Sequence, residues 1–358
     1  MTPRDCPRPE MSRPHRRKPR GFTIIDTLVA TAAIVTLAGA VQVAGNAVDL
    51  QGQRDTDMLN LAWYSGLGAS YAADNDGRYW SFTWQPGEAN SEFADLADLQ
   101  TSAPTINQAH AAQAADILRH RSPIDQDIIP GFTIPEARFS FLVLADYAGI
   151  DLPDPRLVPS GAGAFAAVAR DYSLAETDIW GDNFADFSPE FRTREYFRSL
   201  FQTSASFLQW VDRGENALKL AGSTYDFWNA PSLGVDRIRR LSEVRFPAQK
   251  VLQFSSFDFY SDADSSQFYG LDNSRVSVLF TDGSVQYRRA GDANPGWDPT
   301  RPTSSRPFRF FYDPIHSGWP AIPEDTRVIS VPRMLVTRGG LDGIDFDGPD
   351  IDTGPRFP

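Results

Sequence analysis

One pair of aspartates in the chain has a spacing that suits a bound cation. Asp74 and Asp76 flank Asn75 and are followed by Gly77. Carboxylate oxygens held this close together on a turn are typical ligands of Ca²⁺. The same residue types also form a hydrogen-bonded turn that ends a helix without any metal. We therefore expect a simple turn here and no cofactor, and calcium bound by Asp74 and Asp76 is the alternative.

The residues that other site chemistry needs are scarce. The chain has one cysteine, Cys6, and no serine-hydrolase, Walker A or zinc-protease motif. A glycine pattern over 160–166 is like a dinucleotide-binding loop, but no strand precedes it, so we expect a loop that leads into a helix. We therefore expect no enzymatic activity. Surface or helix-capping roles are expected for three of the four histidines, namely His110, His120 and His316.

Charge is distributed unevenly along the chain. It has 34 Lys plus Arg against 46 Asp plus Glu, a net charge of −12, and the basic residues are 31 Arg and 3 Lys. We attribute the excess of arginine to codon usage. Residues 1–20 carry seven basic and two acidic side chains, so the remainder is strongly acidic. An acidic chain repels the nucleic-acid backbone, and we expect no nucleic-acid partner.

An apolar run follows this basic segment. Residues 22–48 contain no proline and a single charged side chain, Asp26. A helix of this length crosses a hydrocarbon core of about 30 Å. The basic residues before it should stay in the cytoplasm, which places the rest of the chain outside. A carboxylate inside such a helix costs free energy unless it is paired, so we expect Asp26 to have a positively charged partner.

The junction between the two segments reads Arg-Gly-Phe-Thr-Ile-Ile-Asp, from Arg20 to Asp26. This stretch resembles the type IV prepilin cleavage and methylation motif, which pilins share with the pseudopilins of type II secretion. The resemblance implies cleavage between Gly21 and Phe22 and N-methylation of Phe22 by a prepilin peptidase/methyltransferase. Asp26 occupies the acidic position, where the family usually has Glu. The amine created at Phe22 would then be its partner. Met1 and Met11 are alternative start residues.

Small residues form a stripe along the second half of the apolar run. Thr36, Ala40 and Ala44 recur at every fourth position. Such a stripe lets helix backbones approach one another closely in a membrane. We therefore assign these residues, together with Asp26, to assembly with other subunits.

A helical pattern continues beyond the membrane and ends at the turn 74–77. Three glycines, Gly52, Gly66 and Gly68, are expected to weaken or kink this helix. The residues expected on its buried face are Met58, Leu61, Ala62, Ser65, Ala69 and Ala72. Further elements are predicted by apolar periodicity and turn residues: helices over 111–120 and 139–148, and strands over 250–254, 276–280, 284–288, 328–331 and 333–337.

The predicted hairpin carries a second family signal. Strands 276–280 and 284–288 flank a turn made by Asp282 and Gly283. This pattern resembles the C-terminal signature of a large group of bacterial prepilin-like proteins, in which a histidine precedes an Asp-Gly turn by nine intervening residues. Here Asp272 stands at the position of that histidine. The resemblance therefore covers the turn but not the histidine.

Together these features predict an α+β protein. A long N-terminal helix, membrane-spanning in its first half, should pack on an antiparallel β-sheet head domain with additional helices and long loops. The expected divisions are a basic leader at 1–21, a helix at 22–74 that is transmembrane over 22–48, and a head at 75–358. The head should end in a loop-rich, solvated acidic tail at 339–358, whose aspartates are Asp342, Asp345, Asp347, Asp350 and Asp352.

The resemblance implies a structural function. The chain would be a pilin-like or pseudopilin-like subunit, anchored in the inner membrane by a single pass, with its head in the periplasm or at the cell surface. Its partners would be the peptidase and other pilin or pseudopilin subunits. The alternative is a membrane-tethered extracytoplasmic binding protein that uses the prepilin signal for processing only.

Overall fold

The computed structural model describes the greater part of the head and the helix that leads into it. The chain divides into two units, Met1–Ala44 and Gly45–Pro358, and every described residue lies in the second. None of the helices among these residues has the length and apolar character needed to cross a membrane. The described ranges are 50–87, 91–93, 95–100, 103–123, 139–171, 197, 199–208, 239–260, 267–296, 310–312, 328–330 and 332–350.

The first described element is helix α2, Leu50–Asp74. It runs unbroken through its three glycines and ends at the predicted turn. Gly77 has a positive φ of 74° and donates its N–H to the carbonyl of Ala72 at 2.7 Å, which closes the helix end. The buried stripe consists of Asp57, Leu61, Tyr64, Gly68 and Ala72. The predicted face was therefore right for Leu61 and Ala72, but Ala69 is exposed.

A four-stranded antiparallel sheet forms the centre of the head, in the order β1-β2-β5-β6. Its strands are β1 Phe201–Thr203, β2 Val251–Ser255, β5 Arg275–Phe280 and β6 Val285–Arg289. The strand at 250–254 and the hairpin are thereby confirmed. Two small antiparallel pairs complete the described strands: β3 Phe257–Asp258 with β4 Gln267–Phe268, and β7 Phe310–Tyr312 with β8 Val328–Ser330. Helices and an antiparallel sheet together make the protein α+β.

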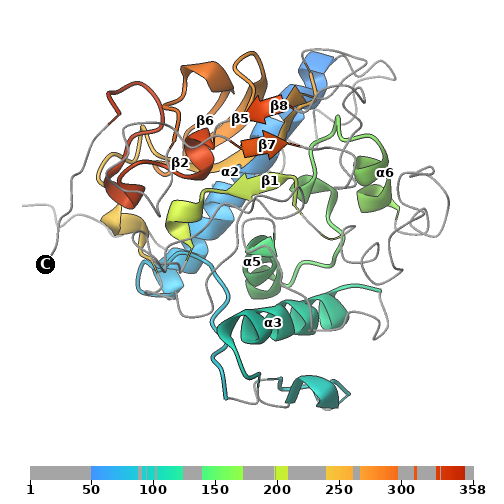
Figure 1. Cartoon of the computed structure of the whole chain (residues 1–358). Helices are drawn as coiled ribbons and strands as arrows, with labels where there is room; N and C mark the ends of the chain where they lie inside the picture. Colours follow the sequence, from blue (N-terminus) through green and yellow to red (C-terminus); the bar gives the residue numbers. More distant parts are fainter. Residues whose placement is uncertain are drawn as a thin grey trace, which may run out of the picture. The chain divides into compact units, whose positions relative to one another are not determined.

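Register shows how the two faces of the sheet are covered. Ser277 pairs with Tyr287 and Val276 with Arg288, so each pair shares one face. Tyr287 meets α2, because the guanidinium of Arg54 lies over its ring at 5.2 Å. Arg288 points to the opposite face, where it contacts the C-terminal part of the chain. Helix α2 thus crosses one face of the sheet, as Figure 1 shows, and a second layer covers the other.

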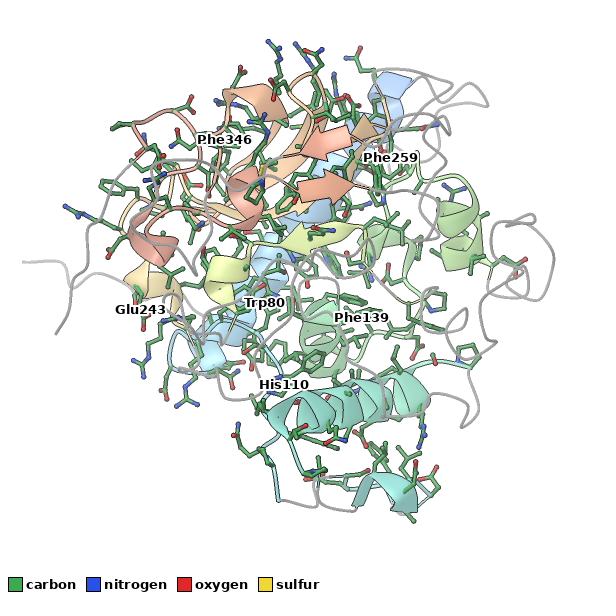
Figure 2. The ribbon with its side chains drawn as sticks, viewed as in Figure 1. Trp80, His110, Phe139, Glu243, Phe259 and Phe346 are labelled. Atoms are coloured by element: carbon green, nitrogen blue, oxygen red, sulfur yellow. The ribbon has the colours of Figure 1, made fainter. Side chains whose placement is uncertain are left out.

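That second layer is the segment 332–347, which corrects two predictions. Residues 333–337 begin with a 3₁₀ turn, Arg333–Leu335, in place of the expected strand. The segment predicted as a solvated acidic tail instead buries Leu341, Ile344 and Phe346. Phe346, labelled in Figure 2, packs edge-on against Phe280 of β5 with ring centroids 5.9 Å apart. Apolar residues spaced among the aspartates provide this packing surface.

Helices α3, α5 and α6 form the rest of the described helical structure. Their bounds are Ile106–Arg121, Phe141–Ala148 and Ala164–Arg170. Helix α3 packs against α5, and α5 packs against α2 (Figure 1). Helix α5 ends at Gly149, with φ of 65°, as predicted. The remaining short 3₁₀ turns are Ala97–Gln100, Pro155–Leu157, Ala205–Phe207, Leu241–Glu243, Ala290–Asp292 and Gly340–Asp342.

Candidate functional site

The buried face of α2 contains a carboxylate that the sequence patterns did not single out. Of the three aspartates in this helix, only Asp57 is buried. Its Oδ1 accepts the backbone N–H of Ser160 at 2.8 Å, and its Oδ2 accepts the hydroxyl of Tyr260. The same hydroxyl accepts the N–H of Gly161 at 3.4 Å. Two segments distant in sequence, one at 160–161 and one at Tyr260, therefore meet at one side chain of α2.

Burial controls the protonation of this group. It raises the pKa of the Asp57 carboxyl to about 7, because the two hydrogen-bond donors offset only part of the desolvation cost. The nearest basic residue on the helix, Arg54, pairs instead with Asp55 at 3.2 Å. Among the described residues Asp57 has no ion-pair partner. Its position four residues before Leu61 is the signal that places it on the buried face.

Gly68 permits a close approach between α2 and the chain that follows it. A Cβ at this position would overlap the Cζ3 atom of Trp80. Trp80, labelled in Figure 2, is almost fully buried and meets Tyr64 edge-on, with ring centroids 5.7 Å apart. The glycine that we expected to weaken the helix thus provides the space that an indole ring fills.

Asp74 and Asp76, the calcium ligands of the alternative interpretation, form part of the turn that ends α2. Asp74 accepts the hydroxyl of Tyr147, and Asp76 lies 3.9 Å from the guanidinium of Arg78. Asp76 also has a positive φ of 55°, as turn aspartates often do. Within the described ranges, no group of three or more His, Cys, Asp or Glu side chains is arranged to hold a metal ion. The geometry matches the simple turn.

The signature residues of the hairpin lie at opposite ends of β5. Asp282 accepts the N–H of Ser284 at 2.9 Å, and Gly283 has a φ of 88°, so both shape the β5–β6 turn. Gly283 also faces α2, since a Cβ there would lie 3.3 Å from the hydroxyl of Ser65. Asp272 precedes the strand and pairs with Arg333 of the C-terminal segment. The structure therefore does not bring Asp272 and Asp282 together.

A buried ion pair joins β2 to the C-terminal segment. The Nζ of Lys250 lies 3.1 Å from the Oδ2 of Asp345, and both side chains are at most 1% exposed. The hydroxyls of Ser204, Ser206 and Thr337 surround the same ammonium group. Burial raises the pKa of the Asp345 carboxyl, although Lys250 and its other partners oppose the shift. Sequence reasoning missed this cluster because 95 residues separate its two charges.

Of the two described histidines, His110 differs from the predicted surface or helix-capping role, whereas His120 lies in the last turn of α3 and its Nδ1 contacts the carbonyl of Asp116. His110, labelled in Figure 2, is buried in α3 near the ring of Phe82, with centroids 5.9 Å apart. His120 lies between two acidic residues: its Nε2 is 2.9 Å from Asp146 and its Nδ1 is 3.6 Å from Asp116. Both side chains therefore help to hold α3 within the head. His316 lies outside the described residues.

The predicted processing and assembly residues fall outside the described ranges. These are Gly21, Phe22, Asp26, Thr36, Ala40 and Ala44. Comparison with family models, with curated proteins and with solved structures finds no match for this chain. The function therefore has to be argued from the motif at residues 20–26 and from the way α2 is built into the head.

Proposed function

We propose that this chain is a structural pilin-like or pseudopilin-like subunit. It is cleaved after Gly21 and is anchored in, or assembled from, the inner membrane through its N-terminal helix. The filament is a type IV pilus or a type II secretion-type pseudopilus, and the head lies in the periplasm or at the cell surface. The observation that carries the proposal is that α2, which follows the apolar run directly, packs along the sheet of the head.

The contacts of α2 support a stalk that is fixed to its head. Asp57 binds two other segments, Gly68 receives Trp80, and Ser65 meets the hairpin turn at Gly283. Because these contacts hold α2 at three positions along its length, the helix moves together with the head. In this arrangement the methylated amine of Phe22 neutralises Asp26 of the same or a neighbouring subunit, and Thr36, Ala40 and Ala44 allow close helix packing.

Processing is tested by mass analysis of N-terminal peptides from the native, membrane-extracted protein. We expect a mature chain that begins with N-methylated Phe22. Co-expression of a prepilin peptidase with the chain should produce the same end, while Gly21→Leu should block cleavage. A native chain that retains its leader, or one that is cut near residues 38–48, contradicts the proposal.

The alternative is a tethered extracytoplasmic binding protein that uses the signal for processing only. The head, residues 75–358, is long for a major subunit. Its length therefore favours a minor or tip subunit, or the tethered binding protein. Asp26→Ala separates the two functions. Incorporation into filaments should fall to background for a subunit, whereas a tethered protein should remain in the membrane unaffected. Asp55→Ala, an exposed aspartate of α2, is the matched control and should leave incorporation unchanged.

A further inference from the structure

Lys250 is an exception in a chain that uses arginine almost throughout. Of 34 basic residues only three are lysines, and the other two, Lys18 and Lys219, lie outside the described ranges. Lys250 is fully buried against Asp345, a setting in which proteins favour the planar, bidentate guanidinium of arginine. An amine offers something that a guanidinium does not: when neutral it is a nucleophile.

The surroundings of the pair connect the amine to both oxygens of the carboxyl group. Nζ of Lys250 donates to Oγ1 of Thr337, and that hydroxyl donates to Oδ1 of Asp345 at 2.6 Å. The other oxygen, Oδ2, accepts the backbone N–H of Val251 at 2.8 Å. Thr337 therefore forms a proton path from Nζ to Oδ1, while Val251 binds the oxygen on which negative charge would develop.

We propose that Lys250 and Asp345 condense to form an intramolecular amide crosslink between the start of β2 and the C-terminal segment. The inference goes beyond the proposed function and does not depend on it. The modification needs no enzyme, metal or oxidant, because an amine and a carboxylic acid yield an amide and one molecule of water. It would join two parts of the chain that are 95 residues apart.

The step begins with proton transfer from the ammonium to Oδ1 through Thr337, which produces a neutral amine and a carboxylic acid. Burial favours this neutral pair and raises the pKa of the Asp345 carboxyl. The nitrogen lone pair of Lys250 then attacks Cγ, and Oδ2 takes up negative charge beside the Val251 N–H. A second amine proton passes through Thr337 to the Oδ1 hydroxyl. The Cγ–Oδ1 bond breaks, Oδ1 leaves as water, and Oδ2 becomes the amide carbonyl oxygen.

The product fits the same hydrogen-bond partners. Oδ2 still accepts from Val251, and the new amide N–H has the hydroxyls of Ser204, Ser206 and Thr337 within its surroundings. The ring of Phe207, whose centroid lies 5.8 Å from Nζ, forms one wall of the site. Because the site is closed to solvent, the water that is released does not return readily to hydrolyse the amide.

Mass spectrometry of the purified full chain tests the proposal. The denatured protein should be lighter than its sequence mass by one water molecule. Trypsin should not cleave after Lys250, and the peptides 246–275 and 339–356 should appear as one linked species. A chain of full sequence mass, with Lys250 and Asp345 on separate unmodified peptides, overturns the inference without affecting the proposed function.

Two threonine variants test the assigned proton path. Thr337→Val removes the hydroxyl that connects Nζ with Oδ1, so crosslinking should slow by about a hundredfold or more. The matched control is Thr281→Val, because the Thr281 hydroxyl donates at 3.0 Å only to the backbone carbonyl of Lys250 and should leave the crosslink intact. Equal crosslinking in both variants would exclude Thr337 from the step. Lys250→Arg keeps the positive charge at this position but removes the amine, so the loss of one water mass should disappear.

Discussion

At the scale of single residues, Gly68 shows how a weak helix former can be required by packing. Trp80 occupies the volume that any larger side chain at this position would need. The contact lies on the buried stripe of α2, so the helix cannot move aside without losing its packing on the head. Packing against Trp80 therefore requires glycine at this position, even though glycine has a low helix propensity.

Gly68→Ala should destabilise the head by about 1–3 kcal/mol, because its Cβ overlaps the indole ring. The matched control is Gly66→Ala in the same helix. Gly66 is exposed, and a Cβ added there would meet no atom within 4 Å, so this change should stabilise the helix by up to about 1 kcal/mol. Thermal unfolding of both variants measures the difference. Equal effects of the two substitutions would contradict the role assigned to Trp80.

At the scale of elements, the C-terminal segment acts as a layer of the core. It covers the face of the sheet that α2 leaves open, and it does so through apolar side chains set between aspartates. Arg288 of β6 reinforces the contact: its guanidinium lies 4.7 Å from the centre of the Phe346 ring and pairs with Asp347 at 2.6 Å. The sheet is therefore enclosed on both sides.

Phe346→Ala tests this layer. Removing a fully buried ring should lower the free energy of unfolding by about 3–5 kcal/mol, through lost burial and the cavity left behind. Phe93→Ala is the control, since Phe93 is 40% exposed and should cost less than about 1 kcal/mol. Chemical denaturation followed by tryptophan fluorescence measures both changes. A loss at position 346 no larger than that at position 93 would show that the segment is not part of the core.

The elements that could be predicted from the sequence are those defined by neighbouring residues. The hairpin over 276–288, the strand at 250–254 and the C-terminal ends of α2 and α5 all depend on local periodicity and on turn glycines. The burial of Phe346 and the pairing of Lys250 with Asp345 depend on contacts between distant segments, which local patterns do not encode. Asp57 was missed because an aspartate is ordinarily a solvent-facing residue.

At the scale of the whole molecule, Asp57 should make stability depend on pH. Its folded-state pKa of about 7 lies above the ordinary value of 3.8, so the folded protein binds this proton more tightly than the unfolded chain. The associated stabilisation is complete below pH 4 and is lost as the pH rises to 7. The loss amounts to up to about 4 kcal/mol.

Asp57→Asn should remove this contribution, because an amide stays neutral throughout. Relative to the wild-type chain, the variant should gain stability progressively between pH 4 and pH 7. Denaturation midpoints measured over this range would show the trend, with Asp55→Asn as an exposed control that should leave it unchanged. Parallel curves for the wild type and Asp57→Asn would contradict the assigned pKa.

The enclosed sheet has a consequence for biogenesis. The ribosome synthesises α2 and the four strands of the sheet before residues 332–347. Until that segment has been made and has packed, the face of the sheet that α2 does not cover is exposed to solvent, and so is the amine of Lys250. The contacts that complete the head are of high contact order, which makes them slow to form. A newly made chain would therefore pass through an aggregation-prone intermediate in which one face of the sheet is still uncovered. Shielding by chaperones would matter most at that moment, just before the last layer closes.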